Sequence, residues 1–256
     1  MSGATPRERL LWLAAAHGVE AGFHDIWGRR HDVSDAGLRA LLGDLGVPAD
    51  SADDVELGLA TAHHRYWRRL AEPSKLNLFL GATVAVLALW QIRTGIKPGL
   101  NFHFYGIAAL TLMFGFWRAT FAGVLILLAN AAFGRGNWSA LGADALLVAA
   151  LPAAVSWGIF RLLERLLPTH FFIYVLGNGF FGAALSVAAI GLATTAVMSV
   201  AGAYSLDYLL THYTPYATLL ISWAEAFTTG MAITVMAVYR PQWLETFDDV
   251  KYLQNK

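Results

Sequence analysis

Charged side chains are distributed very unevenly along this chain of 256 residues. Residues 1–75 carry 20 Lys, Arg, Asp and Glu residues, whereas the longer stretch from Leu76 to Tyr239 carries only ten. Apolar runs such as 78–89 and 217–238 fill that stretch and are separated by short polar breaks. Repeated apolar runs of this length are typical of a chain that crosses a lipid bilayer several times. We therefore expect a polytopic helical membrane domain over residues 74–245.

Composition excludes several classes of function. Hydrophobic residues make up 57% of the chain and charged residues 14%, against about 25% charged in a typical soluble domain. The net charge is zero, so nothing indicates a nucleic-acid partner. The absence of cysteine excludes disulfides, iron–sulfur clusters and cysteine nucleophiles. There is no P-loop motif, and the Gly-x-Gly-x-x-Gly string at 177–182 follows no predicted strand, so we expect no nucleotide enzyme. The sequence does not identify a cofactor.

The polar head, residues 1–73, is predicted to be a small soluble helical domain. An apolar stripe from Leu10 to Val19 has helical spacing. Ser34 is a candidate N-cap for a second helix that ends before Pro48. Ser51 and Asp54 resemble a capping box that opens a third helix to about residue 70. The helical head and the helical membrane domain together predict an all-α fold. Residues 246–256 are predicted to form a cytoplasmic tail.

Six apolar segments are candidate spans: 76–92, 101–116, 119–133, 141–160, 171–200 and 214–238. The second and third are shorter than the roughly 20 residues of a perpendicular span, so we expect a tightly packed or re-entrant hairpin there. Ten basic residues then fall on one side of the bilayer, and Arg93, Lys97 and Arg135 fall on the other. Because basic flanks stay inside, this layout predicts a multi-pass protein of the bacterial inner membrane with both termini in the cytoplasm.

Polar groups within apolar spans are candidate ligand-binding residues, because burying such a group in the bilayer costs free energy unless it is paired or in contact with water. The candidates are His103, Asp144, Glu225 and Asn178. His103 is also the candidate metal ligand. Structural alternatives remain open for three of them. His103 could be an interfacial histidine held by its neighbours, Asp144 could cap the fourth span, and Glu225 could bond to Ser222 or to a tyrosine.

The head resembles the N-terminal helical region of amylomaltases, the 4-alpha-glucanotransferases, over residues 8–73. The resemblance rests on the Asp25-Ile26-Trp27-Gly28 step and on the segment from Ser34 to Pro48. The catalytic barrel of that family does not follow, so no catalytic residue carries over. The resemblance implies a helical docking module.

Residues 76–245 resemble the substrate-specific membrane component of energy-coupling factor transporters for cobalt and nickel. Its landmarks are His103 to Gly106, Gly115 to Trp117, Phe133 to Gly136, Ser139 to Ala143 and Glu225 to Gly230. An Arg-Pro-x-Trp step, Arg240 to Trp243, is similar to an uncharacterised branch of that family. The resemblance implies a component that binds a small solute or metal ion in its bundle and uses ABC ATPases and a coupling membrane subunit as partners.

Two departures from that pattern favour a second hypothesis. The chain begins Met1-Ser2-Gly3, where cobalt and nickel members carry a chelating Met-His-Ile-Pro-Asp-Gly segment. Asparagines of the family's turn are replaced by Asp144 and Leu147. A single imidazole does not supply the several nitrogen donors that nickel or cobalt prefers. The alternative to a transporter component is therefore a non-transporting accessory or scaffold subunit of a larger membrane complex.

Overall fold

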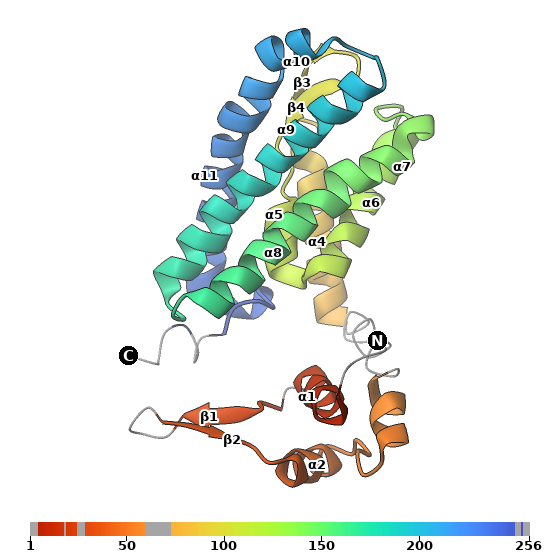
Figure 1. The fold of residues 1–256 in the computed structure, drawn as a ribbon. Coiled ribbons are helices and arrows are strands. Elements are labelled where there is room, and N and C mark those ends of the chain that lie inside the picture. Colours follow the sequence, from red (N-terminus) through yellow and green to blue (C-terminus); the bar gives the residue numbers. More distant parts are fainter. Residues whose placement is uncertain (1–4, 18, 25–28, 60–72, 249–251, 253–256) are drawn as a thin grey trace. The chain divides into compact units, whose positions relative to one another are not determined.

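The computed structural model describes residues 5–17, 19–24, 29–59, 73–248 and 252. These residues are mostly helical, with two short antiparallel hairpins (Figure 1). The prediction of a helical fold is confirmed in outline, and the two hairpins were not predicted. The chain divides into two compact units, residues 1–77 and 78–256.

Side chains cap each helix start in the first unit. Helix α1 (Pro6–Ala16) begins with a capping box, in which the Thr5 hydroxyl accepts the Glu8 N–H and the Glu8 carboxylate accepts the Thr5 N–H at 2.7 Å. Strands β1 (Gly22–His24) and β2 (Arg30–Asp32) pair as a hairpin. The Ser34 hydroxyl caps α2 (Asp35–Asp44) as predicted.

A third helix follows in this unit. Residues 52–59 are helical, and Ser51 and Asp54 exchange the two hydrogen bonds of a capping box, each 3.0 Å long. These bonds hold the pKa of the exposed Asp54 carboxyl below its usual value, mainly through the Ser51 hydroxyl. The expected continuation to residue 70 lies outside the described residues, as do Asp25 to Gly28 and Arg65, Arg68 and Arg69.

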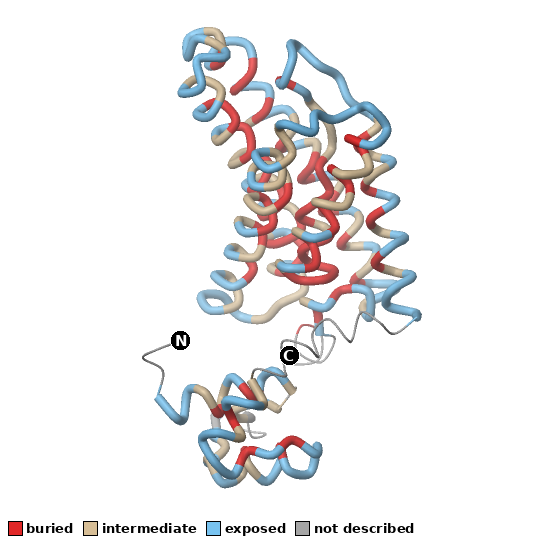
Figure 2. Tube along the Cα trace, turned by 90° about the vertical axis from the view of Figure 1, so that its right-hand side faces the viewer, coloured by how far each residue is buried: buried red, intermediate tan, exposed pale blue. Residues whose placement is uncertain are grey.

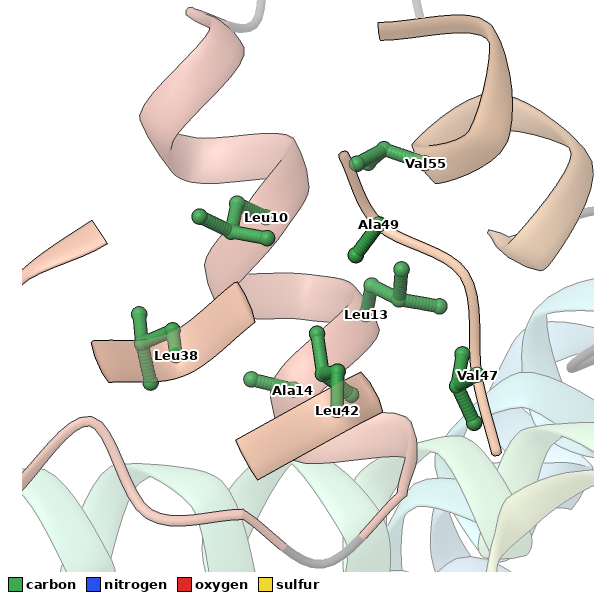
Figure 3. Packing of buried hydrophobic residues seen from close by; sticks show 8 residues of the cluster. All are labelled: Leu10, Leu13, Ala14, Leu38, Leu42, Val47, Ala49 and Val55. Carbon is green, nitrogen blue, oxygen red and sulfur yellow. The ribbon is translucent and has the colours of Figure 1, made fainter. Parts of the chain in front are cut away.

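Apolar side chains from all three helices and the intervening loop meet in one small core (Figure 3). Its members are Leu10, Leu13, Ala14, Leu38, Leu42, Val47, Ala49 and Val55. Leu10 and Leu13, from the predicted apolar stripe of α1, are fully buried. The first unit thus has an apolar core of its own.

The second unit is a helical bundle with one hairpin. It begins within α4 (Pro73–Leu89) and continues in chain order with β3 (Arg93–Lys97), β4 (Leu100–His103), α5 (Ile107–Phe114), α6 (Phe116–Ala132), η2 (Trp138–Ala140), α7 (Leu141–Asp144), η3 (Ala145–Ala150), α8 (Leu151–Leu166), η4 (Ile173–Gly182), α9 (Ala183–Val200), α10 (Leu206–His212), η5 (Tyr216–Ile221), α11 (Ser222–Tyr239) and η6 (Pro241–Trp243). The segments η3, η4 and η5 are π-helical and continue directly into α8, α9 and α11.

Small residues allow the bundle helices to approach closely. A Cβ built on Gly123 of α6 would lie 2.6 Å from the Cβ of Ala149, and one on Gly191 of α9 would lie 2.8 Å from that of Ala217. Such contacts require glycine, because a real Cβ would force the helices apart. Buried positions gather on the helix faces that turn toward the middle of the bundle (Figure 2).

Among the described residues, three helices are long and apolar enough to cross a membrane: Trp138–Leu166, Ile173–Val200 and Tyr216–Tyr239. Two further apolar helices, Pro73–Leu89 and Phe116–Ala132, have 17 residues each. Helix α5 has only eight residues and is joined to α6 through Gly115, whose φ is 78°.

The prediction that a helix begins at residue 101 is wrong. Residues 100–103 form β4, which pairs with β3, and helix α5 begins only at Ile107. The turn between the strands contains Pro98 and Gly99, and Gly99 has a φ of 80°, a conformation that suits glycine. The hairpin packs against α10, where the Lys97 ammonium lies 4.4 Å from the Tyr208 ring centroid.

The C-terminal segment, defined as residues 244–248 with Tyr252, packs against the bundle. The Glu245 N–H donates to the Met113 carbonyl at 3.0 Å, and the Thr246 hydroxyl donates to the Leu112 carbonyl at 2.7 Å. The Tyr174 hydroxyl lies 2.7 Å from that of Thr246. This segment therefore holds the end of α5 to η4.

Candidate ligand-binding site

The His103 imidazole is held in a fixed orientation at the end of β4. Its ring packs against the rings of Trp90 and Tyr105, with centroid distances of 4.6 and 4.3 Å. Its Nδ1 lies 2.9 Å from the Phe104 carbonyl oxygen, which can only accept a hydrogen bond, so Nδ1 carries the hydrogen in the neutral ring. The lone pair of a neutral imidazole is then on Nε2, which makes no hydrogen bond with a described residue.

A cavity of about 550 Å³ lies beside this imidazole. It is bordered by the β3–β4 hairpin, the end of α6, the α7–η3 segment and α9. Its polar lining includes Arg93, Asn101, His103, Asn130, Arg135 and Asp144. The cavity thus brings together two of the four candidates, His103 and Asp144, and neither Glu225 nor Asn178 lines it.

Asp144 lies at the end of α7, immediately before the π-helical segment η3. It does not cap its helix, because the helical region begins at Trp138 and is capped by Asn137, whose side-chain oxygen accepts the Ser139 N–H at 3.1 Å. Within the described part of the chain, the half-buried Asp144 carboxylate makes no hydrogen bond or ion pair. It is available to a ligand in the cavity.

Glu225 fixes the backbone next to His103. Its carboxylate is 1% exposed and accepts the N–H groups of Tyr105, at 2.9 Å, and Gly106, at 2.6 Å. The Thr229 hydroxyl donates to the same carboxylate at 3.3 Å. Gly106 has a φ of 66° and immediately precedes α5. The carboxylate therefore fixes the turn that leads into α5, and it bonds to backbone N–H groups rather than to Ser222 or a tyrosine hydroxyl.

Asn178 is buried in η4, where its neighbour Gly179 packs against Gly230 and Ile233 of α11. Its side-chain oxygen has no hydrogen-bond partner among the described residues. A buried amide oxygen without a partner is costly. Its position away from the cavity gives Asn178 no direct contact with a ligand there.

Two arginines at the cavity were interpreted from sequence only as indicators of topology. Arg93 donates to the Arg135 carbonyl at 2.7 Å, and Arg135 donates to the Gln91 side-chain oxygen at 2.5 Å. Gln91 in turn donates to Asn130 at 3.2 Å. This chain of bonds ties the hairpin to α6. Arg93 begins the hairpin and Arg135 follows α6, and the only signal in the sequence was the charge of each in a region with few charged residues.

The donor set of the cavity is modest for a bare transition-metal ion. The lining contains one imidazole and one carboxylate. In the part of the chain that the structure describes, no three His, Asp or Glu side chains are close enough to hold a metal together. His103 alone is the nitrogen donor that such an ion prefers.

Comparison with known proteins identifies the bundle. Two crystal structures share its fold: a truncated transition metal transporter, at TM-score 0.60 and 20% identity over 69% of this chain and 88% of that one, and a transition metal transporter, at TM-score 0.59 and 20% identity over 68% and 82%. No curated protein matches the sequence. A family model described as the cobalt uptake substrate-specific transmembrane region matches residues 55–243. The chain belongs to this family of membrane transporter components.

Proposed function

We propose that this substrate-specific membrane component binds a small solute in the cavity beside His103 and Asp144. The cavity carries the proposal, since the His103 Nε2 atom and the Asp144 carboxylate that line it have no partner among the described residues of this bundle. Pockets of roughly 300–1,000 Å³ with a few converging polar groups are usual for small-molecule ligands. Glu225 supports the site indirectly, through the Tyr105 and Gly106 N–H groups.

The energy for transport comes, on this proposal, from partner chains. The sequence contains no P-loop, so ABC ATPases and a coupling membrane subunit would supply ATP hydrolysis. Purification of the tagged full-length protein from its native membrane, with identification of stoichiometric partners, tests this. We expect ABC ATPases and a second membrane subunit. Stoichiometric capture of an unrelated membrane enzyme complex would instead favour the scaffold hypothesis.

The six-span layout also belongs to this proposal, with α4, α6 and the three long helices as five of its spans and the eight-residue α5, together with the chain that leads into it, as the sixth. It places the first unit and the C-terminal segment in the cytoplasm of a bacterial cell, and the β3–β4 hairpin outside. The distribution of basic residues supports this orientation. A reporter that is active only in the periplasm should give no signal at either terminus and a signal when inserted at Gly99. A periplasmic signal from one terminus would contradict an even number of spans.

The first unit is, on this proposal, a docking module for a cytoplasmic partner, as the resemblance to the amylomaltase head implies. Its own apolar core supports a separately folded role. Deletion of residues 1–70 should leave membrane insertion intact and remove any partner that depends on this unit. Loss of insertion in the truncated protein would mean that the unit is part of the membrane fold.

A further inference from the structure

The charges around the cavity do not match a bare cation. Arg93 and Arg135 line it together with a single acidic group, Asp144. With the His103 imidazole counted as neutral, the lining carries a net charge of +1. The nearest additional charge on the hairpin is also positive, since the Lys97 ammonium lies over the Tyr204 and Tyr208 rings. A site for a divalent cation would be expected to carry the opposite sign.

The two guanidinium groups are free to bind an anion. Each donates one hydrogen bond to a neutral oxygen, Arg93 to the Arg135 carbonyl and Arg135 to the Gln91 side chain. Neither has a carboxylate partner among the described residues. The bond from Arg93 to the Arg135 backbone holds the two residues next to each other. Two guanidinium groups that line one cavity without a carboxylate partner among the described residues favour an oxyanion, which arginine binds through parallel N–H bonds.

The remainder of the lining suits an organic molecule. The rings of Trp90, Tyr105 and Tyr213 border the cavity, and most of its wall is apolar. Its volume of about 550 Å³ is that of a pocket for a small organic ligand and is far larger than one ion requires. Asn101, Asn130 and Asp144 add polar groups that could orient such a ligand.

We propose that the cavity selects small organic anions, carboxylates in particular, which Arg93 and Arg135 bind at its rim. This assignment rests on the proposed function, because it names the class of solute that the component takes up. His103 and the aromatic rings contact the apolar part of the solute, and Asp144 binds a polar substituent of it. The oxyanion of a lipid headgroup has the same chemistry, so the experiment must separate a dissolved solute from a lipid.

The absence of cysteine from the chain allows a direct measurement of charge selectivity. A single cysteine is introduced by Ala140→Cys, at a half-buried position that lines the cavity. The control is Ala203→Cys, at an exposed turn that does not line it. Each protein, purified in a neutral detergent, reacts with the anionic sulfonatoethyl and the cationic trimethylammonioethyl methanethiosulfonate. We expect the ratio of anionic to cationic rates to be about tenfold higher at the cavity cysteine.

Variants of the arginines show whether their charge is responsible. Arg93→Gln with Arg135→Gln should bring the ratio to that of the control, whereas Arg93→Lys with Arg135→Lys should retain most of the preference. Both arginines are exposed, and a melting curve of each variant confirms that it is folded. Equal ratios at the two cysteines, a preference for the cationic reagent, or an unchanged preference in the glutamine variant would overturn the assignment.

A second experiment repeats the measurement of the two modification rates with added phosphatidylglycerol, an anionic lipid. A preference that persists supports a site for dissolved anions, and one that the lipid abolishes would assign the arginines to headgroups and overturn the proposal. The result of this selectivity test can be distinguished from the result of the partner capture that tests the proposed function. Loss of the preference with ABC ATPases still captured would overturn the anion assignment alone. Capture of an unrelated complex with the preference intact would overturn transport and leave a charge-selective cavity.

Discussion

Replacement of Glu225 by alanine should lower the free energy of unfolding by about 3–5 kcal/mol. The substitution removes the carboxylate that accepts the N–H groups of Tyr105 and Gly106, both inside the bundle. Those two donors would remain buried without a partner, and the lost side chain would leave a void. Reversible unfolding in mixed micelles, followed by circular dichroism, measures the loss.

Two milder substitutions test whether the hydrogen bonds to Tyr105 and Gly106 are responsible. Glu225→Gln keeps one acceptor oxygen but presents an N–H₂ group to the second backbone donor, so we expect an intermediate loss of about 1–2 kcal/mol. Thr229→Val removes only the 3.3 Å bond to the carboxylate and should cost less than about 1 kcal/mol. If the glutamine and alanine variants were equally stable, the bonds to Tyr105 and Gly106 would not be what holds this turn.

Glu225 also illustrates what the sequence could predict. A carboxylate within an apolar span requires partners, so its importance follows from composition alone. Its actual partners are backbone N–H groups 119 and 120 residues earlier in the chain, and no pattern of side chains in the sequence predicts them. The sequence therefore identified the residue and suggested the wrong partners, Ser222 or a tyrosine.

The β3–β4 hairpin was missed for a different reason. Residues 101–116 are mostly apolar, and hydropathy alone assigns them to a single span. The Pro98-Gly99 turn and the left-handed Gly106 divide this run into a strand and a short helix. Both glycines are visible in the sequence, but a glycine in an apolar run is equally compatible with a closely packed helix.

The cavity could be predicted only in part. His103 and Asp144 were selected separately, as polar groups in apolar surroundings, and the fold brings both to one cavity. Arg93 and Arg135 were assigned to a loop face, because loop cations ordinarily report topology. The hydrogen bond between these two residues depends on the hairpin, which hydropathy does not predict, so the sequence did not place them at the site.

The second large effect concerns Arg118, which lies between the predicted spans 101–116 and 119–133. The structure instead buries it in the first turn of α6, where its guanidinium forms an ion pair with Glu245 of the C-terminal segment. Glu245→Ala should cost about 3 kcal/mol, because a buried guanidinium loses this carboxylate. The Glu245 side chain is 38% exposed, so water can enter the space that the carboxylate leaves. The loss of unfolding free energy therefore lies at the lower end of the usual range.

A double-mutant cycle separates the cost of losing the Glu245 carboxylate from the loss of packing. Arg118→Met with Glu245→Ala removes both charges and keeps an apolar side chain of similar length in α6, so this pair should be more stable than Glu245→Ala alone. The control Asp207→Asn changes an exposed acidic residue of α10 and should leave stability within about 0.5 kcal/mol of the unmodified protein. Additive losses in the cycle would show that Arg118 and Glu245 do not act as a pair. A recovered double variant would instead show that the C-terminal segment is held to α5 and η4 mainly by the hydrogen bonds of Glu245 and Thr246, with the ion pair serving to neutralise a charge that the bundle encloses.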